Sequence, residues 1–145
     1  MKIYQRFIIF ILLAALSLCL VSCEKKKQAK VIITEQEFVL RQDEENSITI
    51  DVRGKIKNVG EVDVKKVVVT SYCRSCTEVW GTGKWFTGPE KTTDQKDIIS
   101  YITIGNEEEF HFTGAADIFY YQGEKPPEMP EKLELVIESF ETVEG

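Results

Sequence analysis

The chain has 145 residues, of which 43% are hydrophobic and 29% charged, so it has the length of one domain and a composition that excludes global disorder. Its 24 acidic residues outnumber its 18 basic ones, and two of the basic ones, Lys2 and Arg6, lie in the first 22 residues, which contain no acid. The rest of the chain therefore has 16 basic and 24 acidic residues, a net charge of −8, and this balance excludes nucleic-acid binding because a polyanion would be repelled.

The N-terminal segment is typical of an export signal. Lys2 and Arg6 precede an apolar run over residues 7–21. The run has about 15 residues, whereas a membrane-spanning helix needs roughly 20. It ends in Leu20-Val21-Ser22-Cys23, which resembles the lipobox recognised by the lipoprotein signal peptidase. The resemblance implies a signal peptide over residues 1–22, cleavage before Cys23, and a lipid on the Cys23 sulfur that anchors the protein in the bacterial cell envelope. The alternative is an ordinary secretory leader cut near Ser22.

Residues 24–30, with the sequence EKKKQAK, contain too few apolar side chains to form a core. We interpret residues 23–30 as the lipidated cysteine and a short linker, with a reach of roughly 23 Å when extended, and residues 31–145 as the folded domain. The three lysines at 25–27 either contact anionic lipid head groups or form a solvated spacer.

Alternation of apolar and polar residues dominates the domain. Ile48, Ile50, Val52 and Ile56 share one parity and charged residues occupy the other, which is typical of an antiparallel strand with one buried face. Gly54 lies on the inward parity and predicts a bend or a close backbone approach. Asn58-Val59-Gly60 predicts a turn, since Asn and Gly tolerate positive φ, and Lys65-Lys66 marks a bulge.

The expected strands cover residues 31–40, 48–57, 62–72, 79–86, 98–104, 109–113, 118–121 and 133–140, with turn residues between them. Many short strands with regular turns predict an all-β fold, an antiparallel β-sandwich of about seven to eight strands.

One stretch of the domain is similar to known families. The segment Val52-Arg53-Gly54-Lys55-Ile56-Lys57-Asn58-Val59-Gly60, followed by Val67-Val68-Val69, resembles the opening of the immunoglobulin-like FxLYD and CARDB domains. Ile102-Thr103-Ile104-Gly105-Asn106-Glu107 with Phe110 is similar to a later part of the same domains. Cys73 follows Tyr72 where the FxLYD signature has Asp. The resemblance implies an immunoglobulin-like sandwich in a secreted or anchored protein, and no catalytic residues.

Two cysteines remain in the domain, Cys73 and Cys76. An extended strand holds residues i and i+3 about 10 Å apart, and a disulfide needs Cα atoms within about 7 Å. We predict a structural disulfide, with the strand ending near Cys73 and Arg74-Ser75 in a turn. Two alternatives stay open. One is a redox-active pair, although such a pair would favour a helix after the first cysteine. The other is a metal site, although zinc needs four ligands.

Aromatic residues supply the candidate binding surface. Trp80, Trp85 and Phe86 fall in one expected hairpin, and Tyr120 and Tyr121 in a second group that also contains Phe119. Consecutive strand residues point to opposite faces, so part of each group faces outward. The alternative is that these rings serve as core and edge cover.

No arrangement of residues indicates catalysis. His111, the single histidine, is expected on the outer face of a strand, opposite Phe110 and Phe112. The acidic groups at 43–45 and 107–109 match no calcium loop. We therefore expect no enzyme and no cofactor, but a membrane-anchored binding or scaffold module whose partner is an envelope protein or a glycan. The alternatives are a thiol-redox or metal-binding accessory using Cys73 and Cys76, and a barrel that carries a small ligand.

Overall fold

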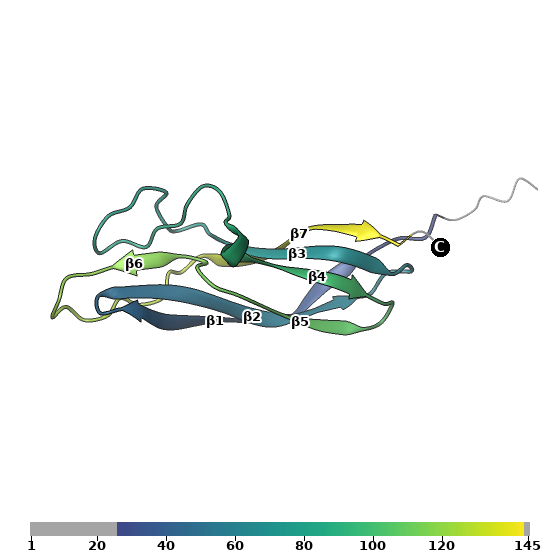
Figure 1. Ribbon diagram of the computed structural model, residues 1–145, viewed down its shortest axis with the longest axis horizontal. Helices are drawn as coiled ribbons and strands as arrows, with labels where there is room; N and C mark the ends of the chain where they lie inside the picture. Colours follow the sequence, from purple (N-terminus) through teal and green to yellow (C-terminus); the bar gives the residue numbers. More distant parts are fainter. Residues whose placement is uncertain (1–25, 144–145) are drawn as a thin grey trace, which may run out of the picture.

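The computed structural model describes residues 26–143, so the predicted signal peptide and Cys23 lie outside the described residues. Seven strands form two antiparallel sheets that pack face to face (Figure 1). The strands are β1 (Val31–Glu44), β2 (Ser47–Asn58), β3 (Val64–Cys73), β4 (Lys96–Ile102), β5 (Glu107–Phe112), β6 (Asp117–Phe119) and β7 (Leu133–Thr142), with a single 3₁₀ turn, η1 (Thr93–Gln95), before β4.

The first sheet has the order β1-β2-β5, with β6 also paired to β2, and the second has the order β4-β3-β7. The chain crosses between the sheets after β2, β4 and β6. This architecture confirms the predicted all-β sandwich. None of the helices among residues 26–143 is long and apolar enough to cross a bilayer.

The core lies between the sheets and follows the predicted alternation. Ile50, Val52 and Ile56 of β2 are fully buried, and they pack with Phe110 and Phe112 of β5 in one hydrophobic cluster. Each such side chain stabilises the fold by about 1.5–3 kcal/mol when it is removed from water. The charged residues between them point outward, so the period of two in the sequence fixes which face of β2 is buried.

Gly54 lies where two backbones approach closely, as predicted. A Cβ at this position would overlap the carbonyl oxygen of Glu35 and would lie 2.7 Å from Cζ of Phe110. Gly54 pairs with Gln36 of β1, and the register of β1 has an irregularity close by, between Ile33 and Glu35. The predicted bulge at Lys65-Lys66 is also present, because Lys66 has a φ of 50° and the pairing of β3 with β7 shifts register there.

The predicted turn after β2 is present, but its predicted cause is wrong. Neither Asn58 nor Gly60 has a positive φ. Instead the Asn58 side chain is completely buried, where it accepts a hydrogen bond from the Gly60 amide (3.0 Å) and donates to the carbonyl oxygens of Val62 (2.9 Å) and Ile102 (3.1 Å). A buried side-chain amide that satisfies the backbone holds this turn.

Gln28 to Lys30 are bound to the same turn. The Val59 amide donates to the Lys30 carbonyl (2.8 Å), the Glu61 amide donates to the Gln28 carbonyl (2.7 Å), and the Gln28 amide donates to the Glu61 carboxylate (3.0 Å). We call this arrangement the N-terminal clamp. Among the described residues, the chain is therefore hydrogen-bonded to the domain from Gln28 onward. Gln28 lies inside the stretch that the sequence predicted to be a linker.

Two segments differ from the predicted strands. Residues 79–86 were expected to form a strand but lie in a loop, where only Phe86 takes part in isolated bridges, to Thr77 and Asp117. Strand β1 is longer than expected and continues from Leu40 to Glu44.

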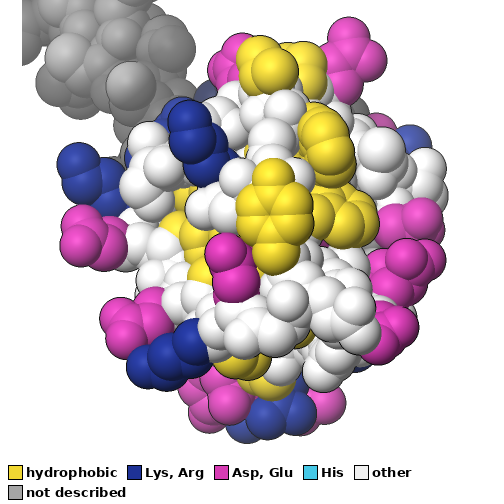
Figure 2. All heavy atoms as spheres, turned by 90° about the vertical axis from the view of Figure 1, so that its left-hand side faces the viewer, with side chains coloured by type: hydrophobic (Ala, Val, Ile, Leu, Met, Phe, Trp, Pro, Cys, Tyr) yellow, Lys and Arg dark blue, Asp and Glu magenta, His cyan; other side chains and the backbone are white. Residues whose placement is uncertain are grey.

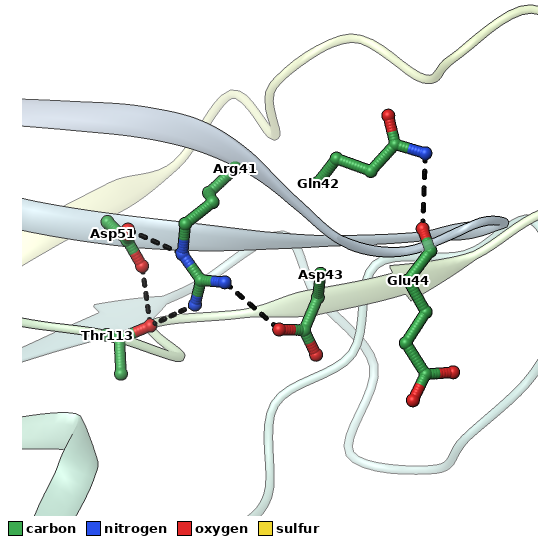
Figure 3. A network of polar contacts seen from close by, with 6 residues as sticks. All are labelled: Arg41, Gln42, Asp43, Glu44, Asp51 and Thr113. Carbon is green, nitrogen blue, oxygen red and sulfur yellow. Dashed lines mark hydrogen bonds and ion pairs between the residues drawn. The ribbon is translucent and has the colours of Figure 1, made fainter.

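A polar network accounts for the longer β1 (Figure 3). The Arg41 guanidinium donates to the carboxylates of Asp51 (2.8 Å) and Asp43 (3.0 Å) and to the hydroxyl of Thr113 (2.9 Å). The hydrogen bonds to the two carboxylates raise the pKa of Arg41, with the bond to Asp51 as the largest cause. Arg41 thus joins β1 to β2 and to the residue after β5, and it keeps a polar segment in the sheet.

The sandwich has two distinct ends. At the proximal end the start of β1 pairs with the end of β2 (Val31 with Asn58), beside the N-terminal clamp and the end of β7. The distal end consists of the β1–β2 turn, residues 74–92 and residues 120–132. The described chain starts and ends at the proximal end, at the right of Figure 1. The 12 residues of β2 run from one end to the other, a length of roughly 40 Å.

Candidate functional site at the distal end

Backbone hydrogen bonds at the distal end join the loop after β3 to β6. The Gly83 amide donates to the Phe119 carbonyl (2.6 Å), and Phe86 and Asp117 exchange two amide–carbonyl bonds (2.9 and 3.0 Å). The Tyr120 amide donates to the Asn46 carbonyl in the β1–β2 turn (3.1 Å). Segments that are far apart in the sequence therefore meet at one end of the sandwich.

Phe119 is the centre of the aromatic side chains at this end. Its ring centroid lies 6.0 Å from that of Trp80, with the rings tilted by 58°, and 6.0 Å from that of Phe86, with the rings stacked at 19°. Such arrangements match the preferred geometry of aromatic pairs. We call Trp80, Phe86 and Phe119 the distal aromatic cluster.

Three large apolar side chains at this end face solvent. Val79 is 77% exposed, Trp80 60% and Tyr121 66%. We call these three residues the distal apolar surface. Figure 2 views the molecule onto this end and shows hydrophobic side chains gathered there, with charged side chains around them.

The two aromatic groups singled out in the sequence thus lie at the same end of the molecule. Of the five candidate residues, Trp80 and Tyr121 are exposed, whereas Trp85, Phe86 and Tyr120 are half-buried. Trp85 packs against the core, and its indole N–H donates to the Glu128 carbonyl (2.8 Å).

Sequence reasoning missed two residues of the site. Phe119 stood in the second aromatic group, but its central place depends on contacts across loops that sequence spacing does not show. Val79, the most exposed large apolar residue, was assigned to an alternating strand, in which it had no special position.

A disulfide bond joins Cys73 to Cys76 at the base of the loop, as predicted, with Cα atoms 5.3 Å apart. Cys73 is the buried last residue of β3, and Arg74-Ser75 form the turn. The loop is further held where the Thr77 amide donates to the Trp85 carbonyl (2.9 Å). In the described part of the chain, the residues directly after Cys76 are not helical, so this pair lacks the helix N-terminus that stabilises a reactive thiolate.

Acidic side chains outnumber basic ones at the distal end. Residues 43–46, 74–92 and 120–132 together hold eight acidic and five basic residues. One of the basic residues, Lys91, lies 5.2 Å from the centre of the Tyr72 ring, and partial burial lowers the pKa of its ammonium group. A second, Arg74, forms an ion pair with Glu134 (2.9 Å). The surroundings of the distal apolar surface are therefore negative in sum.

The outer face of the β1-β2-β5 sheet has an open hollow of about 740 Å³. Its charged side chains pair across strands, Glu37 with Arg53 (2.7 Å) and Glu35 with Lys55 (3.1 Å), and the bond from Arg53 lowers the pKa of Glu37. His111 is exposed in this hollow, opposite Phe110 and Phe112 as predicted. Within residues 26–143, no group of three or more His, Cys, Asp or Glu side chains is placed to hold a metal ion.

No family model, curated protein or solved structure matches the chain. The resemblance to FxLYD and CARDB domains stays a prediction.

Proposed function

We propose that this protein is a bacterial envelope lipoprotein, anchored through a lipid on Cys23, whose β-sandwich is a binding or scaffold module with its recognition surface at the distal end. The observation that carries the proposal is the arrangement of the two ends. The chain enters the domain at the proximal end, and the two most exposed aromatic side chains of the described residues, Trp80 and Tyr121, lie at the other.

The N-terminal clamp supports the anchoring part of the proposal. Because Gln28 is held by Glu61, four residues, 24–27, separate Cys23 from the docked chain. Their extended reach is about 13 Å. A lipid on Cys23 would thus hold the proximal end close to the head groups and turn the distal end away from the bilayer.

The distal end supports the binding part. Large aromatic side chains are enriched at protein interfaces and dominate their energetics. Trp80 on the braced loop and Tyr121 after β6 are exposed at the same end of the domain, which differs from singly scattered surface residues that need no explanation. The disulfide and the backbone bonds to β6 hold this loop in one shape, so binding would order few additional groups.

Metabolic labelling with a fatty acid tests the anchor directly. Wild-type protein is expected to incorporate the label and to sediment with membranes. A Cys23→Ala variant is expected to lose the label, and a Cys19→Ala variant, altered within the predicted signal peptide, is the matched control that keeps it. Labelling and membrane sedimentation of the Cys23→Ala variant would refute the lipid anchor.

A further inference from the structure

We infer that the distal apolar surface of Val79, Trp80 and Tyr121 binds a protein partner that presents an apolar recess bordered by lysine or arginine side chains. The inference rests on the proposed function for where recognition occurs, and it adds the chemical class of the partner.

The composition and shape of this surface favour a protein over a glycan. A sugar is recognised through flat aromatic faces combined with hydrogen-bonding groups. Here the most exposed apolar residue is aliphatic Val79, at 77%, and the Trp80 ring already contacts Phe119. The Trp85 indole N–H is also occupied, by the Glu128 carbonyl. An exposed valine and two exposed large aromatic side chains at one end of the domain match the apolar centre of a protein interface.

The charge around the surface decides between partners of opposite sign. Glu78 directly precedes Val79, and Glu124 lies three residues after Tyr121, where its carboxylate accepts the Tyr121 amide (3.3 Å). Across the distal segments the eight acids exceed the five basic residues. Complementary potentials speed encounter and suppress wrong partners. An anionic bilayer or an anionic polymer would be repelled, whereas a basic border on a protein would be attracted.

The surface is also preorganised. The Cys73–Cys76 disulfide closes the base of the loop, and the Gly83 amide is bonded to Phe119 in β6. A partner therefore meets side chains whose backbone is already fixed, which lowers the entropic cost of association. Rigid exposed tryptophan and tyrosine are the residue types most often found as energetic centres of interfaces.

A random twelve-residue peptide library displayed on phage tests the inference, with the purified full chain in detergent as the target. Enriched peptides are expected to combine aromatic or aliphatic residues with lysine or arginine. A selected synthetic peptide is expected to bind Trp80→Ala or Tyr121→Ala protein at least tenfold more weakly than wild type. Binding is also expected to weaken when salt is raised from 50 to 300 mM, because salt screens the acidic border.

Ile104→Ala is the matched control, since Ile104 is 52% exposed but lies at the proximal end. Its affinity for the peptide is expected to stay within twofold of wild type. Enriched peptides without basic residues, or none that depends on Trp80 and Tyr121, would overturn the inference. Binding to a glycan array or to phosphatidylglycerol vesicles that is lost in the Trp80→Ala variant would overturn it as well. Self-association of the protein that is lost in the same variant would also overturn it. These measurements do not require lipidation, so their failure is distinguishable from failure of the Cys23 anchor.

Discussion

Replacing Gly60 by alanine is expected to open the N-terminal clamp while the sandwich stays folded. A Cβ at Gly60 would lie 2.5 Å from the Lys30 amide nitrogen and 2.8 Å from the Gln28 carbonyl oxygen. Both contacts are with backbone atoms, which a side-chain rotation cannot relieve. The three atoms nearest to this Cβ all belong to residues 28–30, so the strain falls on the clamp.

The size of the effect follows from the hydrogen bonds that are lost. Of the three hydrogen bonds of the clamp, two join backbone groups, from Val59 to Lys30 and from Glu61 to Gln28. A net contribution of about 1 kcal/mol each gives about 2 kcal/mol for local opening. This corresponds to a loss of amide protection of roughly 30-fold.

Hydrogen exchange followed by NMR measures this loss at the Val59 and Glu61 amides, and limited trypsin digestion reports cleavage after Lys30. Both are expected to accelerate in Gly60→Ala, while amides in β2 and β3 keep their protection. Gly81→Ala is the matched control, because a Cβ there meets no atom within 4 Å. Unchanged exchange at Val59 and Glu61 in Gly60→Ala would refute the clamp as described.

Three further predictions concern the domain itself. Gly54→Ala is expected to destabilise the fold by about 3 kcal/mol in urea unfolding, because the added Cβ overpacks the site. Gly88→Ala is the control and is expected to be nearly neutral, since its Cβ would meet its nearest atom at 3.6 Å. Equal effects of the two substitutions would contradict the close approach at Gly54. The Cys73→Ser/Cys76→Ser double variant is expected to stay folded and to lose about 2 kcal/mol or less, and intact mass of wild type under non-reducing conditions should be two hydrogens below the reduced value. Burial lowers the pKa of Lys91, so its charged form destabilises the folded state at neutral pH. This destabilisation diminishes as pH rises through the pKa of the folded state, because Lys91 then loses its proton. Lys91→Met is thus expected to raise the melting temperature at pH 7 and to raise it less at pH 10, and a gain that does not depend on pH would rule out this cause.

The parts of the fold that depend on local pattern could be predicted from the sequence. Apolar residues of β2 and β5 recur at every second position, because a strand with one buried face requires this alternation. Gly54 on the inward parity predicted a bend or a close backbone approach, and the structure has the close approach, to Glu35 of β1. The short spacing of Cys73 and Cys76 predicted a strand end, a turn and a disulfide.

The rest depends on contacts between distant segments. Residues 79–86 have the composition of a strand. Their backbone groups, however, form hydrogen bonds with β6, and the rings of Trp80 and Phe86 pack on Phe119. The extension of β1 depends on Arg41, whose partners Asp51 and Thr113 lie 10 and 72 residues away. No local pattern encodes these distances, and tertiary contacts override local preference in both segments.

The short distance between Cys23 and the N-terminal clamp has a consequence for the affinity that recognition requires. Under the proposed anchoring the lipid would act as a pivot, and the distal apolar surface would move within a hemisphere of about 50 Å radius, set by the reach of the four residues between Cys23 and the clamp and by the length of β2. A partner in the same membrane and within this volume would meet the distal apolar surface at an effective concentration of a few millimolar, on the order expected for a short tether. A dissociation constant in the micromolar range is then enough for nearly full occupancy between neighbours, whereas the released protein, diluted in the surrounding fluid, would leave the same partner almost free.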